Sequence, residues 1–220
     1  MPPGPQYEFR LLPPPGKEIR RPTPSDPAPS CNPPLFNDAM SVRTTVFIEE
    51  QGCSAESELD EDDPRSWHWV MYDTQSDQKV PIGVIRLVPP PHPPHETLLG
   101  NGGEDETRPS AGEHNPHTEP YVKLTRVGLL PGYRGKGLSR QLMDVSLNWA
   151  IDHPENVVSA LGKDAEPWTG LALVHAQVQV EALYARMGFV TDKSMGVWDE
   201  EGISHVGMWK RLDLSQKTGS

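Results

Sequence analysis

One stretch near the middle of the chain constrains the fold more than any other, because an apolar segment, a glycine-rich turn and a helical pattern follow one another directly. Residues 122–130 are β-branched and apolar and predict a strand that ends at Pro131-Gly132. Arg134-Gly135-Lys136-Gly137 comes next, and a helical pattern begins at Ser139. Glycine lets backbone N–H groups approach a ligand, and the first N–H groups and dipole of a helix favour negative charge. The stretch therefore predicts an anion-binding loop.

Three kinds of phosphate-binding loop compete for this stretch. A P-loop needs Ser or Thr directly after its lysine, whereas Gly137 follows Lys136. A dinucleotide-binding loop needs a third glycine where Arg140 stands. The third pattern, Arg134-x-x-Gly137-x-Ser139, resembles the Gln/Arg-x-x-Gly-x-Gly/Ala signature of the GCN5-related N-acetyltransferases. An ordinary strand-turn-helix corner without a ligand is the remaining alternative.

The resemblance implies a coenzyme and the residues that hold it. In that family the loop binds the pyrophosphate of acetyl-CoA, so acetyl-CoA, or coenzyme A after transfer, is the expected co-substrate. Ser139 replaces the usual Gly or Ala, and its hydroxyl is expected to cap the helix. On the preceding strand, the resemblance implies that backbone groups bind the pantetheine arm and polarise the acetyl oxygen. The expected coenzyme-binding residues are Val127, Gly128, Leu129, Arg134, Gly135, Lys136, Gly137, Leu138, Ser139 and Arg140.

Further matches lie on both sides of the loop. Tyr184 stands before Gly188-Phe189, as in the family, and the resemblance implies that Tyr184 faces the coenzyme sulfur. By itself, a tyrosine on an amphipathic helix is equally a core residue with a hydrogen-bonded hydroxyl. Val46-Phe-Ile-Glu-Glu-Gln51, Ala176-Gln177 and the tail at residues 200–208 are similar to the ElaA-like branch of the family.

The general base has several candidates. Many relatives place a glutamate on the central strand, whereas residues 122–130 contain no acid. An unperturbed histidine titrates near 6.5, which suits proton removal around neutral pH and makes His205 a candidate, although a structural role across the sheet is equally open. The catalytic candidates are Tyr184, His205 and Glu50, and the substrate-binding candidates are Glu49, Glu50 and Gln177.

An acidic run covers residues 49–63, which hold eight carboxylates and no Lys or Arg. Runs of this kind are usually solvated loops. The functional alternative is a mouth that attracts an amine substrate, with Glu49 and Glu50 at the end of a predicted helix. The formal net charge of the chain is -11, which argues against a general nucleic-acid binder.

Length and composition predict one domain with extensions. The 220 residues suffice for a single core, and the proline-rich segment 13–34 reads as an extended connection. Residues 89–120 form a long insertion whose four histidines fit no ligand spacing, so a flexible loop is favoured over a metal site, and a lid or oligomer contact stays open. The two cysteines make no disulfide framework, and no apolar stretch is long enough to span a membrane. A cytoplasmic protein is the expectation, with no metal, nucleic-acid or membrane partner.

The order of the predicted elements indicates a mixed α/β sheet rather than an all-parallel one. The resemblance implies the acyl-CoA N-acyltransferase fold, with a splayed central sheet flanked by helices. The predicted strands are 7–12, 67–72, 81–88, 122–130, 170–178, 189–190 and 203–210, and the predicted helices are 35–51, 139–152 and 179–187.

The predicted function is an acetyl-CoA-dependent N-acetyltransferase that acts by direct attack in a ternary complex. Its acceptor would be the primary amine of a small molecule such as an amino sugar, an amino acid or a polyamine. A protein N-terminus or lysine is the alternative acceptor. A coenzyme A-binding sensor or interaction protein without catalysis is the alternative from another class, and a homodimer stays open.

Overall fold

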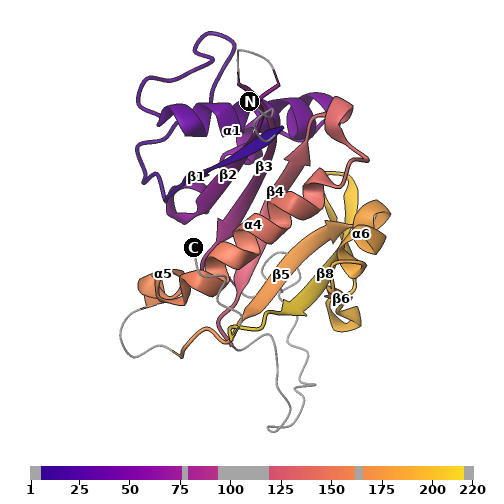
Figure 1. Cartoon of the computed structure of the whole chain (residues 1–220). Coiled ribbons are helices and arrows are strands. Elements are labelled where there is room, and N and C mark those ends of the chain that lie inside the picture. The colour runs from indigo at the N-terminus through magenta and orange to yellow at the C-terminus, as the bar shows by residue number, and fades with distance from the viewer. Residues whose placement is uncertain (1–5, 76–78, 94–118, 162–165, 216–220) are drawn as a thin grey trace, which may run out of the picture. The chain divides into compact units, whose positions relative to one another are not determined.

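The computed structural model describes residues 6–75, 79–93, 119–161 and 166–215 (Figure 1). The chain forms two compact units. The first comprises Met1–Val88 and Leu124–Trp149, and the second comprises Pro89–Lys123 and Ala150–Ser220. None of the helices in the described ranges is long and apolar enough to cross a membrane.

The first unit is a sheet covered by helices. Its strands run in the order β1, β2, β3, β4, and both β1 with β2 and β2 with β3 are antiparallel pairs. Four helical segments lie between β1 and β2 in the sequence, the last of them a 3₁₀ turn at Asp63–Arg65, and a long helix follows β4. The elements are β1 (Tyr7–Leu12), α1 (Pro34–Arg43), a π-helix (Thr44–Glu50), α2 (Ala55–Glu58), β2 (Trp67–Asp73), β3 (Val80–Val88), β4 (Val122–Leu129) and α4 (Leu138–Asp152).

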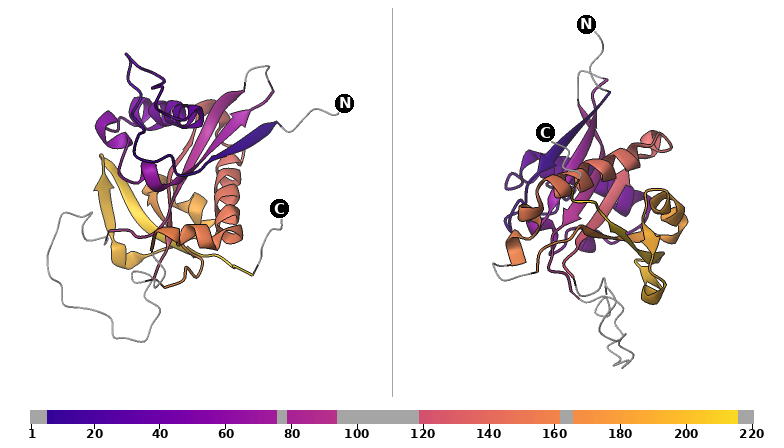
Figure 2. Two further views of the ribbon diagram at one scale, coloured as in Figure 1. Left: turned by 90° about the vertical axis from the view of Figure 1, so that its left-hand side faces the viewer. Right: turned by 60° about the horizontal axis from the view of Figure 1, so that its bottom comes forward.

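Strand β2 shows why helices cover both faces of this sheet. Successive side chains of a strand point to opposite faces. Trp67 and Trp69 contact Trp149 of α4, with ring centroids 4.7 and 5.7 Å apart, whereas His68 packs edge-on against Phe36 of α1. The left view of Figure 2 accordingly shows the strands between α1 and α4. A strand buried on both faces reads as a continuous apolar run, as β2 does.

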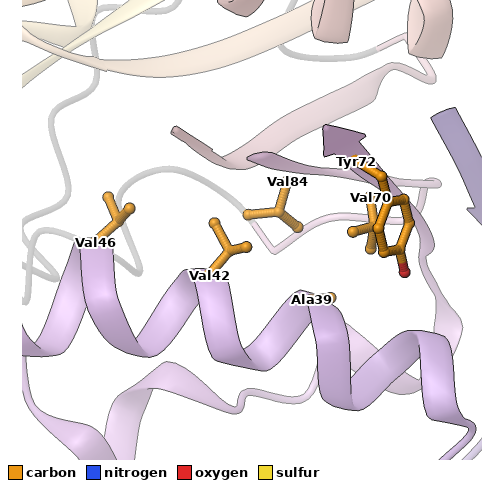
Figure 3. Packing of buried hydrophobic residues seen from close by; sticks show 6 residues of the cluster. All are labelled: Ala39, Val42, Val46, Val70, Tyr72 and Val84. Carbon is orange, nitrogen blue, oxygen red and sulfur yellow. The ribbon is translucent and has the colours of Figure 1, made fainter. Parts of the chain in front are cut away.

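The face toward α1 is packed with small β-branched side chains (Figure 3). Successive turns of α1 and the π-helix contribute Ala39, Val42 and Val46, which pack against side chains of β2 and β3. Tyr72 adds a polar anchor, because its hydroxyl donates a hydrogen bond of 2.6 Å to Asp38 of α1. The cluster consists of Ala39, Val42, Val46, Val70, Tyr72 and Val84.

The second unit is built around its last strand. Strand β8 (Ile203–Arg211) pairs antiparallel with β5 (Leu171–Gln177), β6 (Val190–Thr191) and β7 (Val197–Glu200). The short helices α5 (Pro154–Val157) and α6 (Glu181–Ala185) complete it. The β7–β8 hairpin turns at Glu201-Gly202, both with positive φ.

Three local predictions are corrected. The predicted helix 35–51 is an α-helix that continues as a π-helix from Thr44. The predicted helix 179–187 is a 3₁₀ turn at Val178–Val180 followed by the short α6. Strand β7 was not expected, because four residues with exposed Val197 show little apolar periodicity.

Candidate functional site

The predicted anion loop has the backbone conformation that its glycines allow. Strand β4 ends at Leu129, a 3₁₀ turn follows at Pro131–Tyr133, and α4 begins at Leu138. Gly135 and Gly137 have φ of 75° and 76°, a region that side chains with a Cβ rarely adopt. A Cβ placed on either residue would meet nothing within 4 Å. Residues 134–137 are exposed and lie directly before the first turn of α4, whose N–H groups have no intrahelical acceptor.

The cations of the loop are held in place by contacts within the first unit. Arg134 donates from Nε to the carbonyl of Leu129 at 3.0 Å, and its two terminal nitrogens lie 2.5 and 2.6 Å from the carboxylate of Glu50. Lys136 donates to the carbonyl of Gly132 at 3.0 Å. The hydrogen bond with Arg134 holds the pKa of Glu50 below its usual value. The structure thus brings together Glu50 and Arg134, which lie 84 positions apart.

The helix start differs from the prediction in one respect. Because α4 begins at Leu138, Gly137 precedes the helix, and its carbonyl accepts the first helical hydrogen bond, from Gln141 at 3.4 Å. Ser139 lies inside the first turn and does not occupy the capping position predicted for it. Arg140 is exposed and lies 3.5 Å from Asp144, one turn along the helix.

Strand β4 has an unusual backbone just before the three residues predicted to bind pantetheine. Arg126 has a φ of 52°, which is uncommon for a residue other than glycine and costs about 1–3 kcal/mol. Two residues later, a Cβ on Gly128 would lie 3.3 Å from the ring of Phe47 and 3.5 Å from Val46. Gly128 therefore lets β4 lie close against the π-helix, while Val127 and Leu129 flank it.

The acidic run is only partly solvated, and the prediction is corrected for that part, since Glu49, Glu50, Glu56 and Glu61 are exposed. Glu58 and Asp63 are buried, with 4% and 0% of their side chains exposed, and Asp60 is 33% exposed. They face three arginines from α1, β3 and β4. We call these six residues the arginine–carboxylate network: Arg43, Arg86, Arg126, Glu58, Asp60 and Asp63.

The inner part of the network surrounds Arg43. Its Nε lies 2.6 Å from Glu58 and its Nη1 lies 2.6 Å from Asp63, while Nη2 also donates to the carbonyl of Glu58. Arg86 contacts both oxygens of Asp60 at 2.6 and 2.8 Å and also lies 2.9 Å from Asp63. Burial alone would raise the pKa of Asp63, but the two arginines hold it far below the usual value. The network therefore keeps Asp60 and Asp63 ionised inside the sheet-helix layer.

Sequence reasoning missed the arginines as partners of the acidic run. Arg43, Arg86 and Arg126 lie in elements predicted from apolar patterns, where a charged side chain is almost never buried without a partner. An arginine within an apolar pattern was therefore the signal that a buried carboxylate partner exists. The acidic run at residues 49–63 was the candidate source of such partners.

His68 should make the first unit sensitive to acid. Its ring is buried, Nε2 donates to the carbonyl of Asp63 at 3.1 Å, and Nδ1 is the one buried side-chain nitrogen or oxygen without a partner in the described residues. Burial lowers the pKa of His68 to about 4. Between the unfolded value of about 6.5 and this value, the unfolded chain binds more protons, so the free energy of unfolding falls as pH drops, by about 3 kcal/mol.

Urea unfolding at pH 7 and pH 4 measures this effect. His68→Phe, which keeps a ring against Phe36, should remove most of the pH dependence in this window. The lowered pKa of Asp63 begins to reduce the free energy of unfolding near pH 5, but this contribution is present in both proteins and cancels from the comparison. An equal change in the free energy of unfolding between pH 7 and pH 4 in both proteins would show that another group is responsible.

In the second unit, the carboxylate of Glu200 lies between two histidines. Glu200 accepts hydrogen bonds from His175 Nδ1 at 3.0 Å and from Trp198 Nε1 at 2.8 Å, and its other oxygen lies 4.0 Å from His205 Nε2. Burial raises the pKa of Glu200, but these donors outweigh it and hold the pKa at about 2. Glu200 is therefore ionised at every physiological pH.

The tautomer of His205 follows from its backbone contact. Nδ1 lies 2.8 Å from the carbonyl of Ile203, which can only accept, so Nδ1 carries the proton. In the neutral ring, Nε2 then holds the lone pair that a general base needs. His205 is buried, with 8% exposed, and lies opposite Gln177 in the β5–β8 ladder.

Tyr184 lies on α6 and is buried, with 6% of the residue exposed. Its ring packs edge-on against Phe189 at 5.9 Å, and burial raises the pKa of its phenol. Within the described residues, its hydroxyl makes no hydrogen bond and is not fully buried. Of the other predicted residues, Glu49 is exposed at the end of the π-helix, and Gln177 accepts a hydrogen bond from Gln179 at 2.9 Å.

The histidine-rich insertion falls mostly outside the described residues, which exclude His95, His114 and His117. His92 is described, and its ring stacks on Tyr121 at a centroid distance of 4.3 Å. Within the described ranges, no group of three or more His, Cys, Asp or Glu side chains could hold a metal ion.

Comparison with known proteins identifies the class. The model of the acetyltransferase (GNAT) family matches residues 33–189, and the chain therefore belongs to this family. A protein of Bacillus subtilis strain 168, provisionally named an acetyltransferase, is 28% identical over 181 residues, which are 81% of this chain and 90% of that protein.

Two solved structures share the fold. An acyl-CoA N-acyltransferase from Pseudomonas aeruginosa is 22% identical, with a TM-score of 0.52 over 93% of this chain and 99% of that chain. Escherichia coli ElaA is 19% identical, with the same TM-score of 0.52 and coverage of 93% and 99%. The predicted family and the mixed α/β fold class are thereby confirmed.

Proposed function

We propose that the protein transfers an acetyl group from acetyl-CoA to the primary amine of a small molecule, by direct attack in a ternary complex. The observation that carries this proposal is the open loop between β4 and α4. Its glycines adopt positive φ, nothing fills the space beside them, and cations flank it. A diphosphate fits such a site because backbone N–H groups and the helix dipole both favour an anion.

Each predicted coenzyme-binding residue has a role in this proposal. The amides of Gly135, Gly137 and Leu138 bind the pyrophosphate, with Lys136, Ser139 and Arg140 beside them. Backbone groups of Val127, Gly128 and Leu129 bind pantetheine, and one N–H polarises the thioester carbonyl. A preorganised donor of this kind contributes about 3 kcal/mol in other acyl-transfer enzymes. Glu50 orients Arg134 beside the loop, where Arg134 is a proposed coenzyme-binding residue. Glu49, Glu50 and Gln177 are the proposed substrate-binding residues.

His205 is the proposed base, because its Nε2 is the nitrogen left without a proton. Glu50 is the less suitable candidate, because its ion pair with Arg134 lowers its pKa and so weakens it as a base.

Release of free coenzyme A thiol tests the function. The protein is incubated with acetyl-CoA and a panel of amino sugars, amino acids, polyamines and peptides with free N-termini. Thiol release that depends on a small amine supports the proposal. Release with peptides alone would assign a protein acceptor, and coenzyme binding without release across the panel would support a sensor.

Tyr184→Phe tests the proposed donor to the departing thiolate. Burial raises the pKa of the Tyr184 phenol further above that of a thiol, which is near 8.5, so Tyr184 is proposed to donate a hydrogen bond to the thiolate without transferring its proton. Loss of this hydrogen bond should lower kcat about 10- to 100-fold. The dissociation constant of coenzyme A should stay within about twofold, since the phenyl ring and its contact with Phe189 are kept. Unchanged turnover would instead make Tyr184 a core residue.

A further inference from the structure

The inference concerns Arg126, which lies on β4 one residue before the predicted pantetheine-binding backbone. It rests on the proposed function, because it names the class of acceptor for that same site. Arg126 is the outermost arginine of the arginine–carboxylate network, with 23% of its side chain exposed, against 0% for Arg43 and 2% for Arg86. It is the member of the network's cations that a small molecule can reach.

One edge of the Arg126 guanidinium is fully engaged. Its Nε donates to Glu58 at 3.1 Å, and its Nη2 donates to Asp60 at 3.1 Å and to the carbonyls of Ser57 and Glu58 at 3.3 Å. Glu58 and Asp60 are in turn fixed by Arg43 and Arg86. The guanidinium is therefore held in one orientation before any ligand arrives.

The remaining terminal nitrogen, Nη1, is available. Within the described residues, Arg126 Nη1 makes no hydrogen bond, and the one buried side-chain nitrogen or oxygen without a partner is His68 Nδ1. Nη1 is consequently not fully buried, and both of its N–H donors are unused within the described residues. A fixed arginine with a free terminal nitrogen can bind a carboxylate well, because a charge-assisted hydrogen bond forms without further loss of side-chain entropy.

The local charge balance favours a ligand that carries both signs. The network contains three arginines and three carboxylates and is neutral, although the chain carries a formal net charge of -11. At its exposed end, the carboxylate of Asp60 lies 3.1 Å from Arg126. A cation and an anion side by side complement an ammonium and a carboxylate on the same molecule. A polyamine offers no partner for Arg126.

We propose that the acceptor is an amino acid whose carboxylate binds Arg126 Nη1 beside the predicted thioester site. The pair Arg126–Asp60 then selects amino acids over polyamines, amino sugars and protein N-termini, since none of these carries a carboxylate next to the reacting amine. Arg126 fixes the position of the acceptor and takes no part in proton transfer.

Matched acceptors test this on the wild-type protein. Each amino acid is compared with its carboxamide and with the amine that lacks the carboxyl group, by release of coenzyme A thiol. The amino acid should show a kcat/KM at least about tenfold higher than either analogue, mainly through KM. Turnover of all three at equal kcat/KM would overturn the inference and leave the proposed function intact, whereas no turnover with any amine would count against the proposed function.

Two further measurements separate binding from catalysis. Calorimetric titration of the coenzyme A-saturated protein with the amino acid and its carboxamide should show tighter binding of the acid even if turnover is absent, and equal affinities would overturn the inference. Arg126→Gln should raise KM for the amino acid about tenfold or more and leave KM for the carboxyl-free amine unchanged. Its thermal midpoint shows whether the variant is folded, and an equal rise in KM for all three acceptors would contradict the assigned role.

Discussion

Arg43→Met should lower the free energy of unfolding by about 3–5 kcal/mol, because it leaves buried carboxylates without their main partner. Arg43 is fully buried and contacts both Glu58 and Asp63. Arg86 and Arg126 would still neutralise part of the remaining charge, but neither reaches the position of the Arg43 guanidinium. Urea unfolding at neutral pH measures the change.

Arg10→Met is the matched control. Arg10 also pairs with a carboxylate, Glu8, but its side chain is 48% exposed. Water already solvates both charges, so the same substitution should barely alter the free energy of unfolding. Similar losses in the two variants would mean that the arginine–carboxylate network does not stabilise the first unit.

Gly137→Trp should abolish measurable binding of coenzyme A, with a loss of affinity of at least about 100-fold. The space beside Gly137 is open, so the indole can occupy the position proposed for the pyrophosphate. It would displace several hydrogen bonds between backbone amides and a doubly charged group. Calorimetric titration with coenzyme A gives the dissociation constant directly.

The strained backbone of this variant needs its own control. Gly16→Trp introduces the same side chain at a φ of 80°, also with nothing within 4 Å of the added Cβ, outside the loop. Both variants should lose a similar amount of stability, since tryptophan rarely adopts this conformation. Only Gly137→Trp should lose the coenzyme. Normal affinity in Gly137→Trp would remove the loop from the proposed site.

The elements that carry the loop were predictable because their signals are local. Strand β1 has the predicted bounds, Tyr7–Leu12, and α4 begins one residue before the predicted start and ends at Asp152 as expected. The pattern from Arg134 to Ser139 was sufficient for the family, which the comparison confirms. Glycines at positive φ, apolar periodicity and helix starts depend on neighbouring residues, so one sequence suffices to read them.

Long-range charge pairing was not predictable in the same way. The acidic run was read as solvated, yet Glu58 and Asp63 are buried against Arg43, and Asp60 pairs with Arg86 across 26 positions. Periodicity indicates which residues are buried but not which buried charges meet. That choice depends on the order of strands in the sheet and on the helix that covers them.

The sequence by itself determined the strand, glycine turn and helix of the loop, the family and the mixed α/β class, because each follows from local patterns and from their order along the chain. Only the tertiary structure decided that Glu50 pairs with Arg134 and that Glu200 contacts both His175 and His205. It also decided that Arg126, with 23% of its side chain exposed, keeps one terminal nitrogen without a hydrogen bond within the described residues. The reason is that an ionised side chain inside a protein needs a partner of opposite charge, and folding, rather than proximity in sequence, supplies it.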